Sequence, residues 1–341
     1  MKCHRFTLIA VVCAMILSLS TSAYAGKFMT MHSGSPGGSA YQVGTGLSNL
    51  AHKYAKGDIT IQVTSGKAVP RSLLAAGKGK VDFYNTTPLI NTWLANGQRM
   101  FKKLKNPKEL HANLRAVFVY PIGAYQFVVY ENSGIKTFAD LKGKKVFLGP
   151  KTGAARVISE STIQAVSGLK PNVDYTGITL DWRTSRTSFR DRQLDAIMTL
   201  GAIPSPLVSE WALTNKIRLI GIPASSMKNP LIAKMLKMPG RTIEVIAPDT
   251  YGKNQMNEKP VNALGMWVTL GTHAGVDDES VYQVTKAFWE HIDEFYAVAE
   301  WTKKVNRDTA FTSLDLPLHK GAYRYYKEAG VNIPTHNLPR D

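Results

Sequence analysis

Two short stretches of small and hydroxyl-bearing residues have the composition to bind a charged group. The first reads SGSPGGS at residues 33–39, and the second reads PKTGA at residues 150–154. Apolar residues at the spacing of one helical face follow the first stretch, so it is expected to lead into a helix. The first-turn N–H groups of a helix lack intrahelical partners and carry the positive end of its dipole, which favours an anion. The chemistry that these loops suggest is noncovalent capture of an anionic group.

A structural role explains each loop equally well when it is taken alone. Ser39 and Thr152 stand where the N-cap of the following helix is expected, and hydroxyl side chains are preferred there. The two loops occur, however, at equivalent places in two successive units of strand, loop and helix. Open α/β sheets bind ligands at the carboxyl ends of their strands. We therefore expect residues 33–41 and 150–156 to face each other across one cleft.

Other polar residues follow the next predicted strand and could extend the same site. Ser65, Lys67 and Arg71 lie at the strand-to-helix junction of SGKAVPRSLLAAG, and a guanidinium can pair bidentately with a carboxylate. Arg71 is equally compatible with an exposed helix position. Tyr41, in the first predicted helix, either stacks on a ligand or packs into the core. The polar run at residues 182–186 either lines the cleft or belongs to the surface.

The sequence lacks the usual motifs of covalent, nucleotide and metal chemistry. HSGSPG, at residues 32–37, differs from the Gly-x-Ser-x-Gly nucleophile elbow because Ser33 stands where glycine is required. The glycines at residues 34–46 match neither the dinucleotide fingerprint nor the phosphate-binding loop, and the histidines show no metal-ligand spacing. We therefore expect no enzymatic activity, no cofactor and no metal. The alternative is an exported hydrolase that uses a cleft hydroxyl such as Ser35, with a triad assembled from distant residues.

The first 25 residues have the features of a secretory signal peptide. Basic residues precede the apolar run FTLIAVVCAMILSL, and AYA at residues 23–25 matches a small-x-small cleavage site. The run is shorter than the roughly 20 residues that a membrane-spanning helix needs. We therefore expect export to the periplasm and cleavage after Ala25. Both cysteines, Cys3 and Cys13, lie in this segment, so the mature chain would hold neither a disulfide nor a thiol.

The chain is strongly basic, with 42 Lys and Arg against 25 Asp and Glu and a formal net charge of +17. Such a charge favours anionic ligands or an anionic membrane surface. The cations are spread along the chain, and the densest runs, at residues 102–108 and 142–145, are typical of solvated turns rather than of a nucleic-acid-binding surface. We therefore expect no nucleic-acid partner. A protein that binds partners through its basic face is a competing interpretation.

Short strands alternate with helices through the first 225 residues, which predicts two α/β lobes, each with an open and mostly parallel sheet. Two β-branched and aromatic runs within residues 114–130 are suited to central strands. After residue 225 an irregular, Pro- and Gly-rich connector leads to one more strand at 263–271. Helices are expected at 277–300 and 318–330, with an apolar stripe that belongs to the core.

Taken in order, these motifs resemble those of one known group, the TAXI-type solute-binding proteins of tripartite ATP-independent periplasmic (TRAP) transporters. The resemblance covers nearly the whole mature chain. It is carried by SGSPGGSAYQVG, TSGKAVPRSLLAAGKGKVDF, LRAVFVYPIGAYQFVVYENSGIKTFADLKGKKVFLGPKTGAA, RQLDAIMTLGAIPSPLVSEWA, and PDTYG with DDESVYQVTKAFWEHIDE. Each motif is weak by itself, but together and in the right order they make a specific match.

The resemblance implies a type II periplasmic-binding-protein fold, in which two α/β lobes joined by crossing strands close on a small molecule. Residues 26–121 with 235–341 are expected to form lobe I, which includes the C-terminal helices, and residues 122–234 lobe II. The resemblance also implies an organic-anion ligand, such as glutamate, 2-oxoglutarate or another carboxylate, delivered to TRAP membrane permease subunits by a monomeric receptor. A binder of a heterocyclic or cationic ligand with the same fold is the alternative.

The residue pattern and the resemblance together define a candidate ligand site. Its members are Ser35, Gly38, Ser39, Tyr41, Ser65, Lys67, Ala68, Arg71, Thr87, Thr152, Gly153 and Ala154. Several positions depart from the family pattern, because Ala40 replaces a common aromatic residue and Ala68 and Arg71 replace Ser and Asn. Thr87 stands where Gln is often seen, and Ala154 where Thr is common. These changes favour a more acidic or more apolar acid than glutamate.

Overall fold

A computed structural model describes residues 26–151 and 154–340 of the chain. The predicted signal peptide and two candidate site residues, Thr152 and Gly153, lie outside the described residues. The strands are β1 (Phe28–His32), β2 (Thr60–Thr64), β3 (Phe83–Thr86), β4 (Leu114–Tyr130), β5 (Lys145–Phe147), β6 (Thr176–Ile178), β7 (Ala196–Gly201), β8 (Ile217–Ile220), β9 (Arg241–Ile246) and β10 (Val261–His273). The α-helices are α2 (Ser39–Tyr54), α3 (Val69–Gly77), α4 (Pro88–Ala95), α5 (Pro107–Ala112), α6 (Ala154–Ser167), α7 (Trp182–Arg190), α8 (Pro206–Thr214), α9 (Pro230–Leu236), α10 (Asp278–Glu290), α11 (Ile292–Tyr296) and α12 (Lys320–Glu328).

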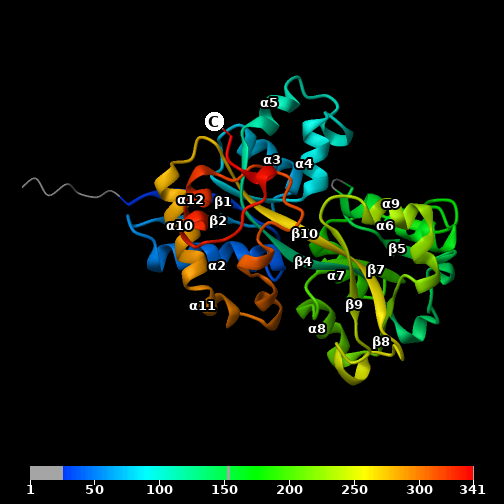
Figure 1. The fold of residues 1–341 in the computed structure, drawn as a ribbon. Helices are drawn as coiled ribbons and strands as arrows, with labels where there is room; N and C mark the ends of the chain where they lie inside the picture. The colour runs from blue at the N-terminus through cyan, green and yellow to red at the C-terminus, as the bar shows by residue number, and fades with distance from the viewer. Residues whose placement is uncertain (1–25, 152–153, 341) are drawn as a thin grey trace, which may run out of the picture.

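One sheet runs through the whole molecule in the order β2-β1-β3-β10-β4-β7-β5-β6, with β8 paired to β4 and β9 paired to β10. β1 is parallel to β2 and β3, and β5 is parallel to β6 and β7. The long strands β4 and β10 are antiparallel to each other, and each is also antiparallel to a strand of one of the parallel groups. They therefore cross from one group of parallel strands to the other (Figure 1).

Helices gather around each group of parallel strands and form two masses on either side of the crossing strands (Figure 1). We call them lobe I, with β1–β3, α2–α5 and α10–α12, and lobe II, with β5–β9 and α6–α9. The predicted fold class, two α/β lobes joined by crossing strands, is confirmed. In the described part of the chain, no helix has the length and hydropathy needed to cross a membrane.

The sequence predicted two strands within residues 114–130, whereas the structure has one continuous strand, β4. The strand passes between the lobes at Gly123, whose φ of +114° lies in the region that favours glycine. A Cβ atom at this position would lie 1.8 Å from the carbonyl oxygen of Gly201, so only glycine fits. The close approach lets one strand pair in both lobes. The sequence also missed α9 and β9, which lie in the region interpreted as an irregular connector.

Two apolar cores hold the elements together. The larger core includes Phe118 on β4, which stacks on Phe288 of α10 with ring centroids 4.9 Å apart. The smaller core lies under α7 and α8, where Tyr130 stacks on Phe189 at 4.5 Å and Phe189 contacts Trp211 edge-on. The apolar stripe predicted for the helices after residue 277 belongs to the larger core, as expected. The helix predicted over residues 277–300 is shorter in the structure, because α10 ends at Glu290.

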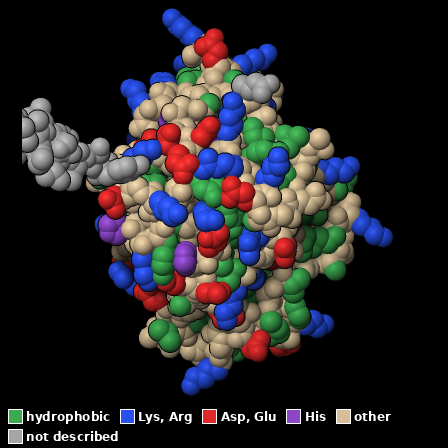
Figure 2. Space-filling view, turned by 60° about the vertical axis from the view of Figure 1, so that its left-hand side comes forward, with side chains coloured by type: hydrophobic (Ala, Val, Ile, Leu, Met, Phe, Trp, Pro, Cys, Tyr) green, Lys and Arg blue, Asp and Glu red, His purple; other side chains and the backbone are tan. Residues whose placement is uncertain are grey.

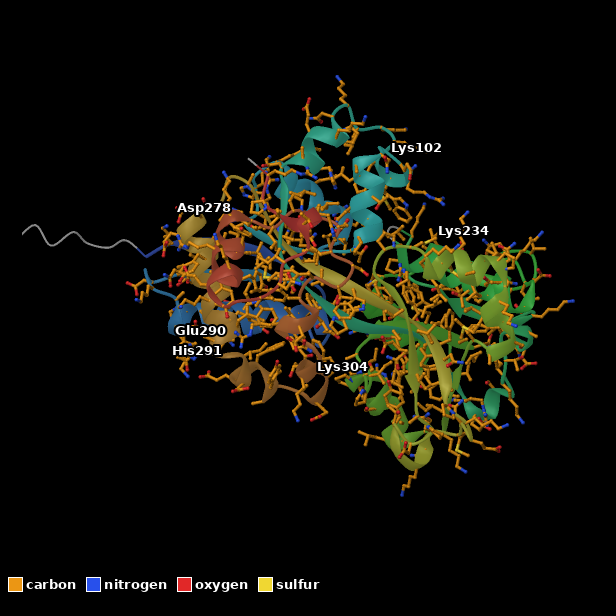
Figure 3. The ribbon with its side chains drawn as sticks, viewed as in Figure 1. Lys102, Lys234, Asp278, Glu290, His291 and Lys304 are labelled. Atoms are coloured by element: carbon orange, nitrogen blue, oxygen red, sulfur yellow. The ribbon has the colours of Figure 1, made fainter. Side chains whose placement is uncertain are left out.

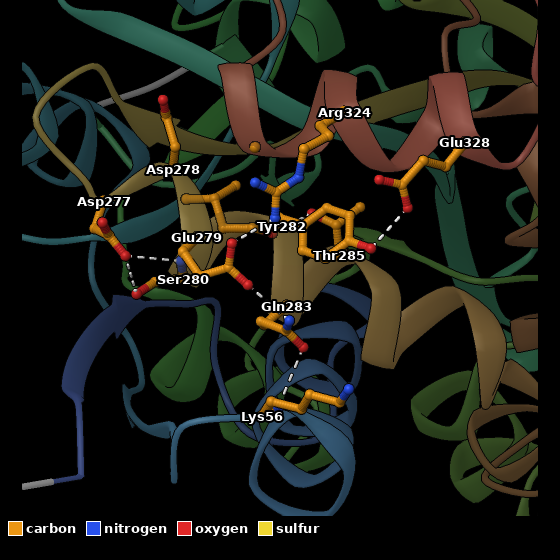
Figure 4. Close-up of polar contacts among 12 residues, drawn as sticks. Lys56, Asp277, Asp278, Glu279, Ser280, Tyr282, Gln283, Thr285, Arg324 and Glu328 are labelled. Atoms are coloured by element: carbon orange, nitrogen blue, oxygen red, sulfur yellow. Dashed lines mark hydrogen bonds and ion pairs between the residues drawn. The ribbon is translucent and has the colours of Figure 1, made fainter. Parts of the chain in front are cut away.

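The outer face of lobe I carries side chains of both signs close together (Figure 2). α10 contributes to this lobe's edge, and Figure 3 labels Asp278 and Glu290 at its two ends. Next to it, Arg324 of α12 donates to Glu279 at 2.6 Å, and Tyr282 donates to Glu328 at 2.7 Å (Figure 4). The charges on these two helices are therefore largely paired, although exposed pairs of this kind contribute little to stability.

Asp277→Ala is expected to lower the free energy of unfolding by about 1 kcal/mol, the usual cost of losing an N-cap. Asp277 caps α10, where its carboxylate accepts from the N–H of Ser280 at 2.9 Å and from the Lys27 ammonium. These hydrogen bonds, first that of Lys27, lower the pKa of Asp277 to about 2. Urea unfolding at neutral pH measures the loss. Asp278→Ala, at the adjacent exposed position that does not cap, is the control, and equal losses in both variants would contradict the assignment.

Candidate ligand site between the lobes

The loops that follow the parallel strands meet at one edge of the sheet in each lobe. In lobe I the N–H of Ser33 donates to the carbonyl of Thr64 at 2.9 Å, and the N–H of Gly66 donates to Gly34 at 3.0 Å. These bonds place the turn after β2 beside the loop after β1. In lobe II the carboxyl ends of β5 and β7 share an edge because the two strands are parallel. Such edges are where open α/β sheets bind ligands.

Ser39 joins the loop of lobe I to lobe II. α2 begins at Ser39 and its N-cap is Gly38, so Ser39 is not the N-cap that the sequence allowed. The Ser39 hydroxyl donates to the carbonyl of Ile122 at 3.1 Å and accepts from the N–H of Ala202 at 3.2 Å. Among the described residues no side chain caps α2. The N–H groups of its first turn are therefore without a side-chain acceptor, which is the arrangement that favours an anion.

A cavity of about 280 Å³ lies beside this contact. Lobe I contributes the loop before α2 and the first turn of that helix. Lobe II contributes the end of β7, the start of α8 and a side chain from α7. The lining residues are Pro36, Gly37, Gly38, Ser39, Gln42, Arg186, Thr199, Leu200, Gly201, Ala202, Ser205, Pro206, Leu207 and Glu210. Both lobes therefore form its walls, and the volume suits a small organic molecule.

Arg186 brings a positive charge to the cavity. Its side chain is half-buried, and its Nε atom is buried without a hydrogen-bond partner among the described residues. Burial lowers the pKa of Arg186, and nearby Glu210 opposes that change. The ordinary value for arginine is so high that the guanidinium remains a cation at neutral pH. Since a buried N–H without an acceptor is costly, an anion that accepts from this guanidinium would relieve the cost.

Gln42 and Glu210 add further polar groups to the lining. The indole N–H of Trp301 donates to Oε1 of Gln42 at 2.7 Å. Because an indole can only donate, the amide oxygen is occupied and the amide nitrogen of Gln42 is left as a donor. Glu210 is exposed and supplies a carboxylate. The cavity thus offers a guanidinium, an amide donor and a helix N-terminus to an anionic group, and one carboxylate to a cationic group.

A buried network fixes the turn that forms the lobe II wall. Nε2 of Gln126 donates to the carbonyls of Gly201 at 3.1 Å and Ala202 at 3.0 Å. The Tyr251 hydroxyl donates to Oε1 of Gln126 and accepts from the N–H of Ser205 at 3.0 Å. Burial raises the pKa of Tyr251, so the hydroxyl keeps its proton. The wall is therefore positioned by side chains that do not themselves line the cavity.

Only part of the sequence-predicted site comes together at this cavity. Gly38 and Ser39 line it. Ser35 and Tyr41 are half-buried members of the same loop and first turn, but neither is a lining residue. The predicted residues after β2 are all exposed and do not line it either: Ser65, Lys67, Ala68 and Arg71. The turn that carries them lies beside the loop after β1 rather than on the cavity wall.

The remaining candidates belong to helix starts elsewhere. Thr87 is buried and is the N-cap of α4, where its hydroxyl accepts from the N–H of Ile90 at 3.3 Å. Ala154 is the buried first residue of α6 and does not line the cavity. The loop at residues 33–39 is thus brought together with residues 199–210, through Ser39 and Ala202.

Sequence reasoning missed several lining residues. Arg186 stood in the run that was left undecided between cleft and surface. Asp181 is a signal from which the start of α7 could have been predicted, because aspartate is a preferred N-cap residue. A helix that starts there has Arg186 in its second turn. No local pattern predicts that Gln42 or Glu210 lines a cavity. The helical pattern shows which face of a helix is buried, but not which segment of the chain packs against that face. In the described part of the chain, no group of three or more His, Cys, Asp or Glu could hold a metal ion.

The chain matches one protein family in sequence and is similar to several solved structures. A sequence model described as the NMT1-like family matches residues 31–330. Among solved structures, the periplasmic aliphatic sulphonate binding protein SsuA from Escherichia coli is similar at 17% identity and a TM-score of 0.45, covering 92% of this chain and 96% of that chain.

Two further solved structures are similar over comparable lengths. One is DctP7, a Bordetella pertussis extracytoplasmic solute receptor binding pyroglutamic acid, at 12% identity, a TM-score of 0.47 and coverage of 89% of this chain and 93% of that chain. The other is a TRAP periplasmic solute binding protein from Desulfovibrio desulfuricans with bound sn-glycerol-3-phosphate, at 11% identity and a TM-score of 0.48, covering 91% and 94%. Two of the three are named as binding proteins and the other as a solute receptor.

Proposed function

This chain belongs to the NMT1-like family, and from that premise we propose that it is a periplasmic solute-binding receptor that captures a small organic anion. The ligand is a carboxylate in the class of glutamate and 2-oxoglutarate. The receptor is of the TAXI type, is exported with cleavage after Ala25, and acts as a monomer that touches the subunits of a TRAP permease transiently. It forms and breaks no covalent bond.

The observation that carries the proposal is the pairing of a cation with an uncapped helix N-terminus in one cavity. The guanidinium of Arg186 comes from lobe II, and the first turn of α2 comes from lobe I. Both favour a negative charge, and the amide nitrogen of Gln42 adds a donor. A carboxylate bound here would touch both lobes at once.

Ligand capture then follows from the two-lobe architecture. Lobe I and lobe II separate in the ligand-free protein. An anion interacts with both walls only when the lobes are together, and this difference in interaction free energy shifts the population toward the closed form. Ser39, which bonds to Ile122 and Ala202, is a contact that separation of the lobes would break.

Glu210 bears on whether the carboxylate ligand also carries a positive charge. Its carboxylate lines the same cavity as Arg186 and would favour a ligand that carries an ammonium group as well as a carboxylate. Glutamate and 2-oxoglutarate differ in just this respect, because an amino group in one replaces an oxo group in the other. The ratio of their affinities, measured in the wild type and in Glu210→Gln, therefore reports whether Glu210 contacts the ligand.

Thermal unfolding in the presence of organic acids tests the proposal. A ligand that binds only the folded protein stabilises it by about 2.7 kcal/mol at a concentration of 100 times its Kd, which raises the melting temperature by several degrees. We expect glutamate, 2-oxoglutarate or a related carboxylate to produce this shift. If no carboxylate raises the melting temperature while a cationic or heterocyclic compound does, the ligand class proposed here is wrong and the same-fold alternative applies.

A further inference from the structure

The segment that joins α4 to α5 concentrates positive charge at the surface of lobe I. Residues 99–108 read RMFKKLKNPK, in which five of ten residues are Lys or Arg and none is acidic. Lys102, Lys103, Lys105 and Lys108 are all exposed. Figure 1 places α4 and α5 at the top of lobe I, and Figure 3 labels Lys102 on the side of this lobe away from Asp278 and Glu290. None of the segment lines the cavity.

The backbone of this segment is held in place, so its charges have a fixed arrangement. Phe101 is only 1% exposed and anchors the segment in the larger core. The guanidinium of Arg99 lies over the ring of Trp93, 5.7 Å from its centroid. Asn106, before the start of α5, donates to Glu109 at 3.1 Å. The lysines between these anchors therefore project from an ordered surface.

The end of α3 adds two more lysines to the same region. A Cβ atom at Gly77 would lie 2.9 Å from the carbonyl oxygen of Leu110, so α3 packs directly against α5. Asn113 also donates to the carbonyl of Gly77, at 3.1 Å. Lys78 and Lys80 follow at once and are exposed. We call Lys78, Lys80, Lys102, Lys103, Lys105 and Lys108 the α3–α5 lysine patch.

One acidic residue borders the patch, the exposed Glu109 next to Lys108, and it accepts from Asn106 rather than from a lysine. In the described part of the chain, the ion pairs involve none of its lysines. On the α10–α12 face of the same lobe, by contrast, cations form ion pairs: Arg324 pairs with Glu279, and Lys286 pairs with Glu290. Unpaired like charges repel one another and oppose the compact state. A surface that keeps them is suited to an anionic partner.

The side chains of the patch favour a lipid surface over a structured acidic protein. Lysine is a compact point charge without a fixed hydrogen-bonding direction, whereas arginine suits bidentate recognition of a defined group. The one arginine of the segment, Arg99, is placed over Trp93. Met100 is 38% exposed among the lysines and offers an apolar side chain to the headgroup boundary. We propose that the α3–α5 lysine patch docks this protein on a bilayer that contains anionic phospholipids.

Vesicle sedimentation tests the proposal. Each lysine near an anionic surface strengthens binding about fivefold, and salt weakens it. We expect the purified protein to sediment with vesicles of phosphatidylglycerol and phosphatidylcholine in equal parts, to be released by high salt, and not to sediment with pure phosphatidylcholine. The triple variant K102E/K103E/K105E should reduce the partition coefficient by at least about tenfold.

The control is K142E/K253E/K259E, which changes the net charge equally at exposed lysines outside the patch. Melting curves verify that both triple variants fold. A third variant, Met100→Ser, tests the patch without a change of charge and is expected to weaken vesicle binding about threefold. Equal losses in the two triple variants, or no binding of the wild type at low salt, would overturn the proposal. Retention of the wild type on poly-glutamate but not on vesicles would also overturn it and identify an acidic protein as the partner.

Discussion

Arg186→Ala is expected to weaken carboxylate binding by at least about tenfold and to leave the ligand-free protein as stable as the wild type. A charge-assisted hydrogen bond contributes roughly 1.5–3 kcal/mol, which corresponds to about ten- to hundredfold in Kd. The free protein should lose little, because Arg186 lies at the cavity with its Nε unpartnered among the described residues. Calorimetric titration with glutamate and 2-oxoglutarate measures the affinity, and thermal unfolding without ligand measures the stability.

Two matched controls identify which cation meets the ligand. Arg183 lies on the same helix, is exposed and does not line the cavity, so Arg183→Ala should change the affinity by less than about twofold, as expected for a screened surface charge. Arg71 is the cation that the sequence placed at the cleft, and it is exposed outside the cavity. If Arg71→Ala loses binding while Arg186→Ala retains it, the carboxylate binds beside the turn after β2 and the site proposed here is wrong.

Asp315→Asn is expected to stabilise the protein at pH 7.5 by about 2 kcal/mol and to have little effect near pH 4. Asp315 is partly buried, and desolvation raises its pKa to about 6, although the hydrogen bond from Asn91 at 3.0 Å opposes the rise. Asn91 is itself fixed by the hydroxyl of Thr86, which donates to Oδ1 of Asn91 at 2.7 Å. An asparagine at 315 keeps an oxygen that accepts from Asn91 and removes the buried charge.

The direction of the pH dependence follows from the proton balance. Between about pH 4 and pH 6 the folded protein holds a proton on Asp315 that the unfolded chain has released, so stability falls as the pH rises through this window. Asparagine has no such proton, so the gap in stability between variant and wild type should open across the same window. Other groups contribute in the opposite direction, because burial lowers the pKa of His273 and His319. Only the difference between the two proteins therefore isolates Asp315.

Urea unfolding of both proteins at pH 4 and pH 7.5 measures this difference. Asp308→Asn, at an exposed carboxyl in the same C-terminal region, is the control and should show no pH-dependent gap. A constant difference between wild type and Asp315→Asn at the two pH values would show that Asp315 is not desolvated in the folded protein.

Local sequence pattern was sufficient to place many of the elements. The helical spacing of Val43, Leu47 and Leu50 predicted a helix after the small-residue loop, and all three side chains are buried in α2. The alternation of strands and helices predicted two α/β lobes, which the sheet order confirms. These features depend on periodicity and on turn residues within a few positions, so they can be predicted from the chain without knowing its neighbours.

The candidate site was predicted less completely. The sequence identified the loop at residues 33–39, and Gly38 and Ser39 line the cavity. It gave Arg71 and Lys67 the cationic role, whereas the cavity is lined by Arg186, and it gave Gln42 and Glu210 no role. Periodicity states which face of a helix is buried, but it does not state which segment of the chain packs opposite that face.

The sequence by itself determined that a loop of small residues opens a helix in lobe I, because glycine, serine and apolar spacing act over a few residues. Only the tertiary structure decided what that loop meets. Ser39 reaches Ala202, 163 residues away, because β10 pairs with β3 of lobe I and with β4, while β4 pairs with β7 of lobe II and passes against Gly201 at Gly123. Arg186, on the helix that precedes β7, lines the same cavity. Contacts between such distant segments depend on strand pairing across the whole sheet, which no local pattern specifies.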